Sequence, residues 1–270
     1  MKKYYDRINN RLIFIKQLAT PEYWDKQWET NNLLDIIKKG ERERFVSATT
    51  RKFIKPNKER KILEGGCGNG QFVYSLQCRG YDAYGVDFAA STIAKIQNVM
   101  PELKIQIGDV RSLPYPDGNF DGYWSLGVIE HFFDGYVPIA KEMARVIKPG
   151  GFLFLTFPYM SPLRFLKVKM GFYSACEEKL GLSNFYQFAL DWKKVNKNFK
   201  QFGFTMVYKR PFDGLKGFKD EAPMGVRKIF QILYDCKSVY CMVINYFLSI
   251  ILSPFCGHTV LLVFRRDQQN

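Results

Sequence analysis

The chain has 270 residues, 47% of them hydrophobic, which suits one large globular domain, with or without attachments, and excludes a disordered protein. It has six cysteines without a CxxC pair and only two histidines. We therefore expect neither a metal cage nor a disulfide framework, and a reducing compartment fits. The charged N-terminal stretch lacks an apolar core followed by a small-residue cleavage site, so no secretory signal is expected.

The formal net charge of +14 is distributed unevenly along the chain. Residues 1–60 contain 15 basic and 8 acidic residues, residues 158–220 contain 12 and 5, and residues 61–157 contain 8 and 10. The basic surface therefore belongs to the flanks of an acidic central block. Such flanks suit an anionic partner, whether a membrane, a nucleic acid or an acidic substrate, or they simply keep the protein soluble.

The first segment, residues 1–59, is predicted to form a helical cap on the domain that follows. It contains three aromatic residues close together, Tyr23, Trp24 and Trp28. They either pack a leading helix onto the domain or close over a bound ligand.

Short apolar runs alternate with helical patterns from Lys61 to Phe157, which predicts a parallel sheet with crossover helices. Strands are expected in RKILEGG, YDAYGVD, LKIQIGD, DGNFDGYWSLG and FLFLTF, and helices in GQFVYSLQCRG, ASTIAKIQNVM and DGYVPIAKEMARVIKPGG. Two later runs, GFTMVYKRPF and HTVLLVFRR, are expected to add a sixth and a seventh strand. The predicted fold class is α/β: a doubly wound, Rossmann-like seven-stranded sheet with helices on both faces and helical inserts after strands 5 and 6.

The glycine-rich loop after the first strand excludes two kinds of nucleotide site. A phosphate loop needs Lys and then Ser or Thr after its last glycine, but Gln71 and Phe72 follow Gly70. A dinucleotide fingerprint needs glycines at its first, third and sixth positions, but the sixth position counted from Gly66 is Gln71. The alternate glycines of this loop therefore indicate that the backbone approaches a different ligand closely.

Polar residues follow the next three strands at their carboxyl ends, where sheets of this kind bind ligands. Asp87 lies about 20 residues after Gly66, a spacing suited to accepting hydrogen bonds from two ribose hydroxyls. Asp109 follows the third strand and can accept from an exocyclic amine, beside Val110, which can pack on a purine. Residues 125–127 follow the fourth strand, where backbone would pass under the ligand. Both acids could instead be helix caps or turn formers, but their places at successive strand ends favour binding.

This block resembles the class I S-adenosylmethionine-dependent methyltransferases, in particular their small-molecule, type 11-like branch. The resemblance rests on LEGGCGNG, GVDFAASTI, GDVRSLPYPDGNFDGYWSLGVIEHF and ARVIKPGGFLFLTFP. It implies a cofactor domain over residues 60–160 and S-adenosyl-L-methionine as the cofactor, with no metal. By the resemblance, Glu64, Gly66 and Gly68 would line the methionine portion, Asp87 would hold the ribose, and Asp109 with Val110 would frame the adenine. The other cofactor-binding residues expected are Phe88, Ser125 and Leu126.

His131 is the candidate catalytic residue. Methyl transfer needs a base only where the acceptor must lose a proton, and His131 is the one titratable side chain near the predicted site whose unperturbed pKa suits that work. The alternative is that Glu130 and His131 only order the loop after the fourth strand.

The acceptor should be selected by the inserts beyond the fifth strand. Residues 161–187 are a basic, apolar insert, suited to a lid over an apolar acceptor or to a membrane surface. A helix is expected from about Phe188 to Phe202. Its core-facing stripe would consist of Phe188, Trp192, Val195, Phe199 and Phe202. Residues 188–270 are expected to complete the sheet, with an apolar helical insert at about 214–256.

The last insert contains an uncharged run. No Asp, Glu, Lys or Arg occurs from Ser238 to Phe264, and residues 239–256 are nearly long enough to span a bilayer. A single span would separate the seventh strand from its sheet, so a helix lying on the membrane or against a partner fits better. We therefore expect peripheral membrane contact through 161–172 and 224–256. Burial within the protein or in a dimer interface is the alternative.

Three functions fit these observations. The first is methylation of a small or lipid-linked acceptor, with oxygen favoured, by a cytoplasmic protein at the inner face of the membrane. The second is RNA methylation, which the charge suggests, although an Asn-Pro-Pro-aromatic run after the fourth strand, a Pro-Cys nucleophile and an appended RNA-binding module are lacking. The third is a binding or scaffold protein that kept the fold without catalysis.

Overall fold

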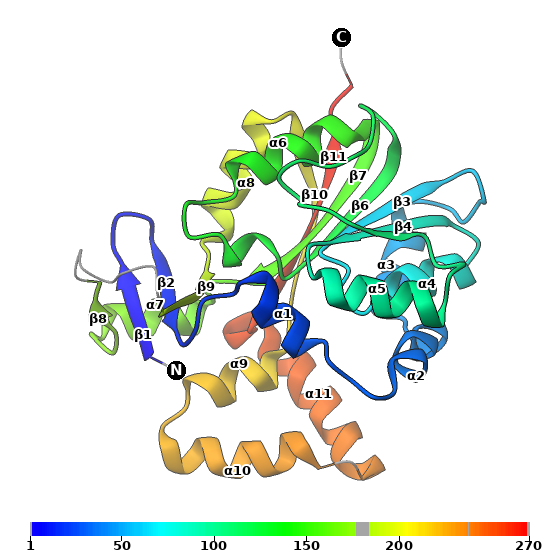
Figure 1. The fold of residues 1–270 in the computed structure, drawn as a ribbon. Helices are drawn as coiled ribbons and strands as arrows, with labels where there is room; N and C mark the ends of the chain where they lie inside the picture. Colours follow the sequence, from blue (N-terminus) through cyan, green and yellow to red (C-terminus); the bar gives the residue numbers. More distant parts are fainter. Residues whose placement is uncertain (1, 177–183, 237, 269–270) are drawn as a thin grey trace.

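The computed structural model describes residues 2–176, 184–236 and 238–268 (Figure 1). Its larger sheet has seven strands in the order β10, β11, β7, β6, β3, β4, β5. In chain order they are β3 (Lys61–Gly65), β4 (Asp82–Asp87), β5 (Ile105–Ile107), β6 (Phe120–Leu126), β7 (Ile147–Pro158), β10 (Phe204–Phe212) and β11 (Thr259–Arg266). The first five run parallel, and β11 lies antiparallel between β7 and β10. The predicted seven-stranded α/β sheet is confirmed.

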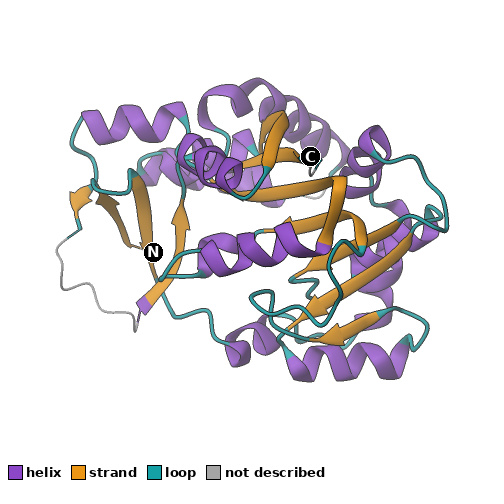
Figure 2. Cartoon of the chain, turned by 90° about the horizontal axis from the view of Figure 1, so that it is seen from above, coloured by secondary structure: helices purple, strands orange, loops and turns teal. Residues whose placement is uncertain are grey.

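Helices cover both faces of this sheet, as the view from above shows (Figure 2). Helices α6 (Val137–Val146) and α8 (Trp192–Gln201) pack on one face through residues such as Met143 and Phe199. The other face is covered by α2 (Leu33–Lys38), η1 (Lys39–Arg42), α3 (Phe45–Phe53), α4 (Gln71–Cys78) and α5 (Ala90–Val99). Because both faces are buried, the central strands read as near-continuous apolar runs.

The carboxyl ends of the parallel strands lie at one edge of the sheet. Strands β3, β4 and β6 end at Gly65, Asp87 and Leu126, and paired register keeps these ends together. Loops that leave this edge open the crossover helices. The edge is therefore where a ligand site is expected in a doubly wound sheet.

A second, four-stranded sheet was not expected from the sequence. It has the order β8 (Ser174–Ala175), β1 (Lys2–Asp6), β2 (Arg11–Ile15), β9 (Phe185–Ala189). The prediction of a helical cap is therefore wrong for the first fifteen residues, which form a β-hairpin, and helix α1 (Pro21–Gln27) begins only after it. Phe188 is also misplaced by the prediction, because it pairs with Ile13 in β9, and α8 starts at Trp192 behind the capping residue Asp191.

A buried ionic cluster ties the hairpin to the inserts. The carboxylate of Glu221, at the end of α9 (Gly214–Glu221), lies 2.7 Å from Lys3 Nζ in β1. It also lies 3.1 Å from Arg164 Nε and 3.0 Å from Lys167 Nζ, both in α7 (Pro162–Lys169). Burial by itself raises the pKa of Glu221, but Arg164 and Lys3 outweigh it, so the pKa falls well below its usual range. The carboxylate therefore stays charged and holds three chain segments together.

Helices α10 (Met224–Asp235) and α11 (Val239–Cys256) complete the apolar insert and meet in a V at the lower edge of Figure 1. Helix α11 is the one helix among the described residues long and apolar enough to cross a membrane, and only 11% of it is buried. The alternative of burial within the protein is therefore wrong.

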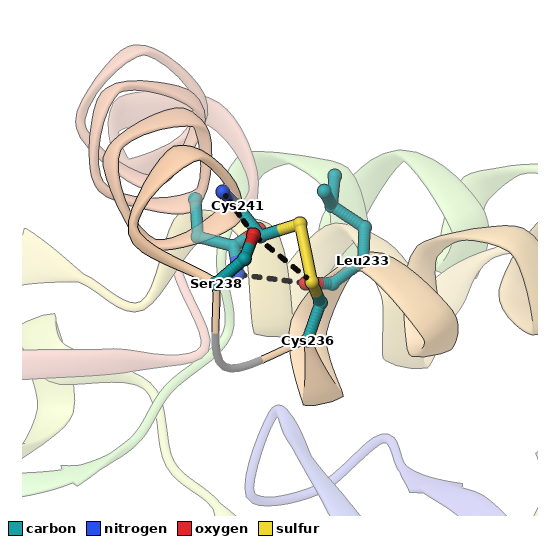
Figure 3. Close-up of a disulfide and its surroundings, with 5 residues drawn as sticks. Leu233, Cys236, Ser238 and Cys241 are labelled. Atoms are coloured by element: carbon teal, nitrogen blue, oxygen red, sulfur yellow. Dashed lines mark hydrogen bonds between the residues drawn. A yellow bond between two sulfur atoms is a disulfide. The ribbon is translucent and has the colours of Figure 1, made fainter.

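A disulfide joins Cys236 and Cys241, whose Cα atoms are 5.9 Å apart, across the turn between these helices (Figure 3). The sequence had indicated no disulfide framework, because the two cysteines are five residues apart and match no recognised spacing. The bridge links residues close together in the chain and leaves Cys67, Cys78 and Cys256 as thiols.

Residues 177–183 of the predicted insert lie outside the described residues.

Candidate cofactor and acceptor site

A cavity of about 340 Å³ opens at the carboxyl edge of the larger sheet. Its size falls in the range of roughly 300–1,000 Å³ that small-molecule sites occupy. The residues that line it are Leu18, Ala19, Thr20, Pro21, Trp24, Trp28, Gly66, Asp87, Phe88, Asp109, Val110, Arg111, Leu126, Gly127, Val128, His131, Phe132, Phe133, Asp134 and Phe185. Of the residues expected to bind a cofactor, Gly66, Asp87, Phe88, Asp109, Val110 and Leu126 are thus brought together here.

The glycine loop forms the floor of the cavity at Gly66. Its amide donates to Val86 O at 2.7 Å, and its φ of +77° is a left-handed conformation that favours glycine. A Cβ at this position would come within 2.6 Å of Val128 Cγ2. Glycine therefore keeps the backbone both bent and open to the cavity.

Asp87 connects the end of β4 to the glycine loop. One carboxylate oxygen accepts from the Gly68 amide at 2.8 Å, and the other accepts from the Ala89 amide at 2.9 Å. Burial raises the pKa of Asp87, and the hydrogen bonds from Ala89 and Gly68 oppose that rise. Because each oxygen can accept more than one hydrogen bond, the carboxylate can still bind hydroxyl groups of a ligand.

Asp109 and Val110 lie beside Asp87 in the wall of the cavity. The Asp109 carboxylate pairs with Arg111 NH2 at 2.6 Å, and this partner lowers the pKa of Asp109. Val110 is buried, while Phe88 exposes more than a third of its surface. An acid, an aliphatic side chain and an aromatic ring are therefore placed side by side, which suits a purine with an exocyclic amine.

Helix α1 and its C-cap residue cover the cavity with two tryptophans. The rings of Trp24 and Trp28 are stacked with centroids 5.8 Å apart, and both line the cavity. Tyr23 is buried beneath them. The two tryptophans therefore form part of the cavity wall, while Tyr23 packs α1 onto the domain.

Three of the predicted cofactor residues do not line the cavity. Trp28 lies so close over Gly68 that a Cβ there would be 2.8 Å from its ring. Ser125 is fully buried in β6, and its Oγ has no hydrogen-bond partner among the described residues. Glu64 is also buried, in β3 behind the loop.

The environment of Glu64 fits a cationic cofactor. Its Oε2 has no hydrogen-bond partner among the described residues, and burial together with the nearby Asp87 raises its pKa well above the usual range. A buried carboxyl group beside a second acid is stabilised by an added positive charge. S-adenosylmethionine carries a sulfonium and an ammonium rather than phosphates, so this acidic end of the sheet fits that group.

His131 lies at the end of η2 (Ile129–His131) and lines the cavity. Its Nδ1 is 2.7 Å from Tyr186 O, which can only accept, so Nδ1 carries the proton and Nε2 keeps a lone pair. The imidazole packs edge-on against Trp24, with ring centroids 5.0 Å apart. Burial lowers the pKa of His131 to about 4. The side chain is therefore a neutral hydrogen-bond acceptor at neutral pH.

Sequence reasoning missed the apolar part of the cavity wall. It is formed by Leu18, Phe132, Phe133 and Phe185, and Phe133 packs edge-on against Phe185 at 5.2 Å. Phe132 and Phe133 adjoin His131 in sequence, which was the available signal for them. Phe185 belongs to β9 of the small sheet, and no local pattern connects it to the site.

Comparisons with known proteins agree with this geometry. A family model described as "Methyltransferase domain" matches residues 63–155. A probable S-adenosylmethionine-dependent methyltransferase from Mycolicibacterium smegmatis is 31% identical over 99 residues, covering 37% of this chain and 38% of that protein. The 2-methyl-6-phytyl-1,4-hydroquinone methyltransferase of Synechocystis is 33% identical over 96 residues, covering 34% and 30%. The solved PH0226 protein from Pyrococcus horikoshii has the same fold, with a TM-score of 0.53, 18% identity and coverage of 92% and 97%.

The fold and the site define a Rossmann-like α/β class with a pocket at the carboxyl edge of the sheet. More specifically, residues 63–155 match a methyltransferase domain, and the relatives and the fold support a class I S-adenosylmethionine-dependent methyltransferase domain over this part of the chain, with S-adenosylmethionine as its cofactor. The matched segment spans less than two fifths of the length of each of these curated relatives. Of the residues that line the cavity, those between Leu18 and Trp28 and the residue Phe185 lie outside the matched segment.

Proposed function

We propose that the protein transfers a methyl group from S-adenosylmethionine to an oxygen atom of a small or lipid-linked apolar acceptor. The observation that carries the proposal is the lining of the cavity, which combines the acids Asp87 and Asp109 with the aromatic residues Trp24, Phe132 and Phe185. The acids suit the adenosine. The aromatic residues suit an acceptor with a large apolar surface.

For methyl transfer, the main task of the protein is to position the cofactor and the acceptor. Bound S-adenosylmethionine supplies an electrophilic methyl group on sulfur. The glycine loop at Gly66 and the acids Asp87 and Asp109 hold the adenosine portion, and α1 closes the cavity against water. His131 Nε2, held by the Nδ1 contact to Tyr186 O, accepts the hydrogen bond of the acceptor hydroxyl and orients its oxygen. It takes up the proton that the hydroxyl loses as its oxygen bonds to the methyl group, and S-adenosylhomocysteine is the leaving group.

The acceptor class is supported by the apolar wall and by one relative. The Synechocystis relative is named for a hydroquinone that bears a phytyl chain, so an acceptor with an apolar tail is known among similar proteins. An oxygen acceptor is favoured because a neutral histidine can accept a hydrogen bond from a hydroxyl group.

We place the reaction in the cytoplasm, at the inner face of a membrane. The thiols of Cys67, Cys78 and Cys256 favour a reducing compartment, although the Cys236–Cys241 bridge is a feature rare in the cytosol. The exposed apolar helices α10 and α11 favour a membrane surface.

The test combines binding and turnover. Calorimetric titration of the purified protein in detergent should give binding of S-adenosylmethionine and none of NADH. Incubation with radiolabelled S-adenosylmethionine and a membrane lipid extract should then place label in an organic-soluble product, and base-labile or ether-linked label would identify an oxygen acceptor. Label incorporated only into added RNA would establish the RNA methyltransferase instead. Cofactor binding without any labelled product from lipid, small-molecule or RNA fractions would favour the scaffold.

A further inference from the structure

Most of the large apolar side chains that are exposed among the described residues lie in α10 and α11. Tyr240 is 84% exposed, Ile232 is 74% exposed and Ile251 is 70% exposed. The other members of this surface are Met224, Val226, Ile229, Tyr234, Val239, Met242, Val243, Ile244, Tyr246, Phe247, Ile250 and Phe255. A contiguous exposed surface of this size marks an interaction site rather than a solvated face.

Helix α11 has its polarity reversed relative to a helix of a water-soluble protein. Its polar residues face the protein: Asn245 Nδ2 donates to Leu233 O at 2.8 Å, and Ser253 Oγ accepts from the Gly214 amide at 3.1 Å. The remaining faces carry the exposed apolar side chains. In water the opposite arrangement would be more stable, so the outer surface of α11 is suited to an apolar surrounding.

Helix packing in this region uses small residues. A Cβ added at Gly214 of α9 would overlap the backbone of α11 at Ser249 and Ser253, and one added at Gly217 would overlap Cys256. Close backbone approach through Gly and Ser is the way helices associate in lipid, where large apolar side chains gain nothing by turning inward. The contacts of α9 with α11 therefore agree with the reversed polarity of α11.

Helix α10 has a polar and an apolar face. Arg227, Lys228, Gln231 and Asp235 fall on one side of the helix, and Ile229 and Ile232 project from the other. A basic polar face opposite an apolar one is typical of helices that lie in the plane of a membrane surface. The long, exposed side chain of Lys228 can reach the headgroups from that position, while Arg227 Nη2 donates to Asp220 O at 2.8 Å.

The topology excludes a single crossing. Strand β10 ends at Phe212 and β11 begins at Thr259, and these two residues pair with each other. Both ends of the insert therefore return to the same sheet edge. Helix α10, with 12 residues, is about 18 Å long, far short of a hydrocarbon core of about 30 Å. The hairpin can thus enter one leaflet but cannot pass through the bilayer as a pair of spans.

Exposed basic side chains lie on the hairpin and on the helix packed against it. Lys228 belongs to α10, and Lys169 of α7 is exposed next to the apolar Met170 and Phe172. Helix α7 packs against α11. An apolar surface bordered by positive charge is complementary to a bilayer with anionic headgroups.

We propose that α10 and α11, with the end of α7, dock the protein onto one leaflet of an anionic lipid bilayer. The hairpin leaves the sheet where Thr259 pairs with Pro158, at the same carboxyl edge that carries the cavity. Docking therefore brings the cavity to the lipid surface. This deepens the membrane location proposed above, but it depends on no methyl acceptor.

Vesicle flotation of the full chain tests the proposal without S-adenosylmethionine. We expect the wild type to float with phosphatidylcholine vesicles that contain phosphatidylglycerol, and more weakly with phosphatidylcholine alone. The double variant Phe247→Glu/Ile251→Glu should lose at least about tenfold in vesicle affinity, since two outward apolar side chains become charged. The matched control Val99→Glu changes an exposed apolar residue at the C-terminal end of α5, away from the carboxyl edge of the sheet, and should bind as the wild type does.

The charge contribution has its own variant. Arg227→Gln/Lys228→Gln should weaken binding to the anionic vesicles severalfold and leave binding to neutral vesicles unchanged. Sedimentation equilibrium without lipid tests the alternative that a second copy of the chain covers this surface. A wild type that ignores both vesicle types, or a dimer that the Phe247→Glu/Ile251→Glu variant dissociates, would overturn the proposal. If the protein does not float but still transfers methyl groups, only the proposed docking surface is contradicted. If it floats but transfers no methyl group, only the proposed reaction is contradicted.

Discussion

The amide of Gly68 donates a hydrogen bond of 2.8 Å to the carboxylate of Asp87, so the end of β4 holds the glycine loop that follows β3. Two strand ends are thereby locked into one surface. Asp87 acts on the cavity twice, as part of its lining and as the anchor of the loop that forms its floor.

Replacement of Asp87 should therefore weaken cofactor binding strongly. Asp87→Ala removes a charged acceptor and frees the Gly68 amide, and we expect a loss on the order of 2 kcal/mol or more in the binding free energy of S-adenosylmethionine. Titration calorimetry measures it. Asp87→Asn keeps one acceptor oxygen and should lose less. An unchanged affinity in Asp87→Ala would remove the assignment of the ribose site.

The sheet could be predicted from the sequence because its strands are marked locally. Strands β3, β5 and β6 are followed directly by glycine and β4 ends at Asp87, and the same signals identified Gly66, Asp87 and Asp109 at the sheet edge. Leu126 and His131 follow from the end of β6. All five line the cavity, and their predicted binding roles await the measurements proposed here.

The features that could not be predicted depend on distant parts of the chain. Phe188 fits a helical stripe with Trp192 and Val195, but it pairs with Ile13, more than 170 residues earlier, and lies in a strand. The hairpin of β1 and β2, which contains Ile13, occupies the place where the predicted helical cap was expected to begin. Phe185 reaches the cavity from this small sheet, and Gly68 fails to line it because Trp28 lies over it. Tertiary pairing decides these positions, and local propensity does not record it.

Gly66 and Gly80 form a matched pair for testing the loop. Both have positive φ, +77° and +85°, but a Cβ would meet Val128 at 2.6 Å at Gly66 and nothing within 4 Å at Gly80. Each alanine variant should lose about 1 kcal/mol of unfolding free energy through backbone strain. Gly66→Ala should in addition bind S-adenosylmethionine at least about tenfold more weakly.

The double variant Gly66→Ala/Val128→Ala separates steric overlap from backbone strain. If the overlap with Val128 is the cause, affinity should recover in part. Equal cofactor affinity in Gly66→Ala and Gly80→Ala would contradict the placement of the loop at the cavity floor.

His131 should make the stability depend on pH in the acidic range. Burial lowers its pKa to about 4, against about 6.5 in an unfolded chain. Between these values the unfolded chain binds the proton and the folded one does not, so the free energy of unfolding falls as the pH drops from 6.5 towards 4. This single group accounts for a loss on the order of 3 kcal/mol.

The measurement is a set of urea unfolding curves across that pH range for the wild type and for His131→Gln. The variant should show a shallower decline, while His258, whose pKa burial and then Arg164 also lower, keeps its own contribution. NMR titration of the His131 ring should show a midpoint near 4. A midpoint near 6.5 would mean that the imidazole is exposed to water and not held against Tyr186 O.

Glu221 should be a large single contributor to stability. Its buried carboxylate contacts Lys3, Arg164 and Lys167, and Tyr173 donates to it at 2.6 Å. Glu221→Gln leaves three cations around a neutral amide, Lys3 from β1 and two from α7. We expect a loss of roughly 3–5 kcal/mol in the free energy of unfolding, measured by urea denaturation.

The exposed Glu102 supplies the control, because Glu102→Gln removes the same charge at the surface and should change stability by less than about 0.5 kcal/mol. The double variant Glu221→Gln/Arg164→Met tests the mechanism. Removing the buried Arg164 charge together with its partner should recover part of the loss, since the cost comes from an uncompensated buried cation. A double variant less stable than Glu221→Gln alone would show instead that Arg164 acts mainly through its bond to Tyr159 O, 2.7 Å away, and that the cluster is not held by Glu221.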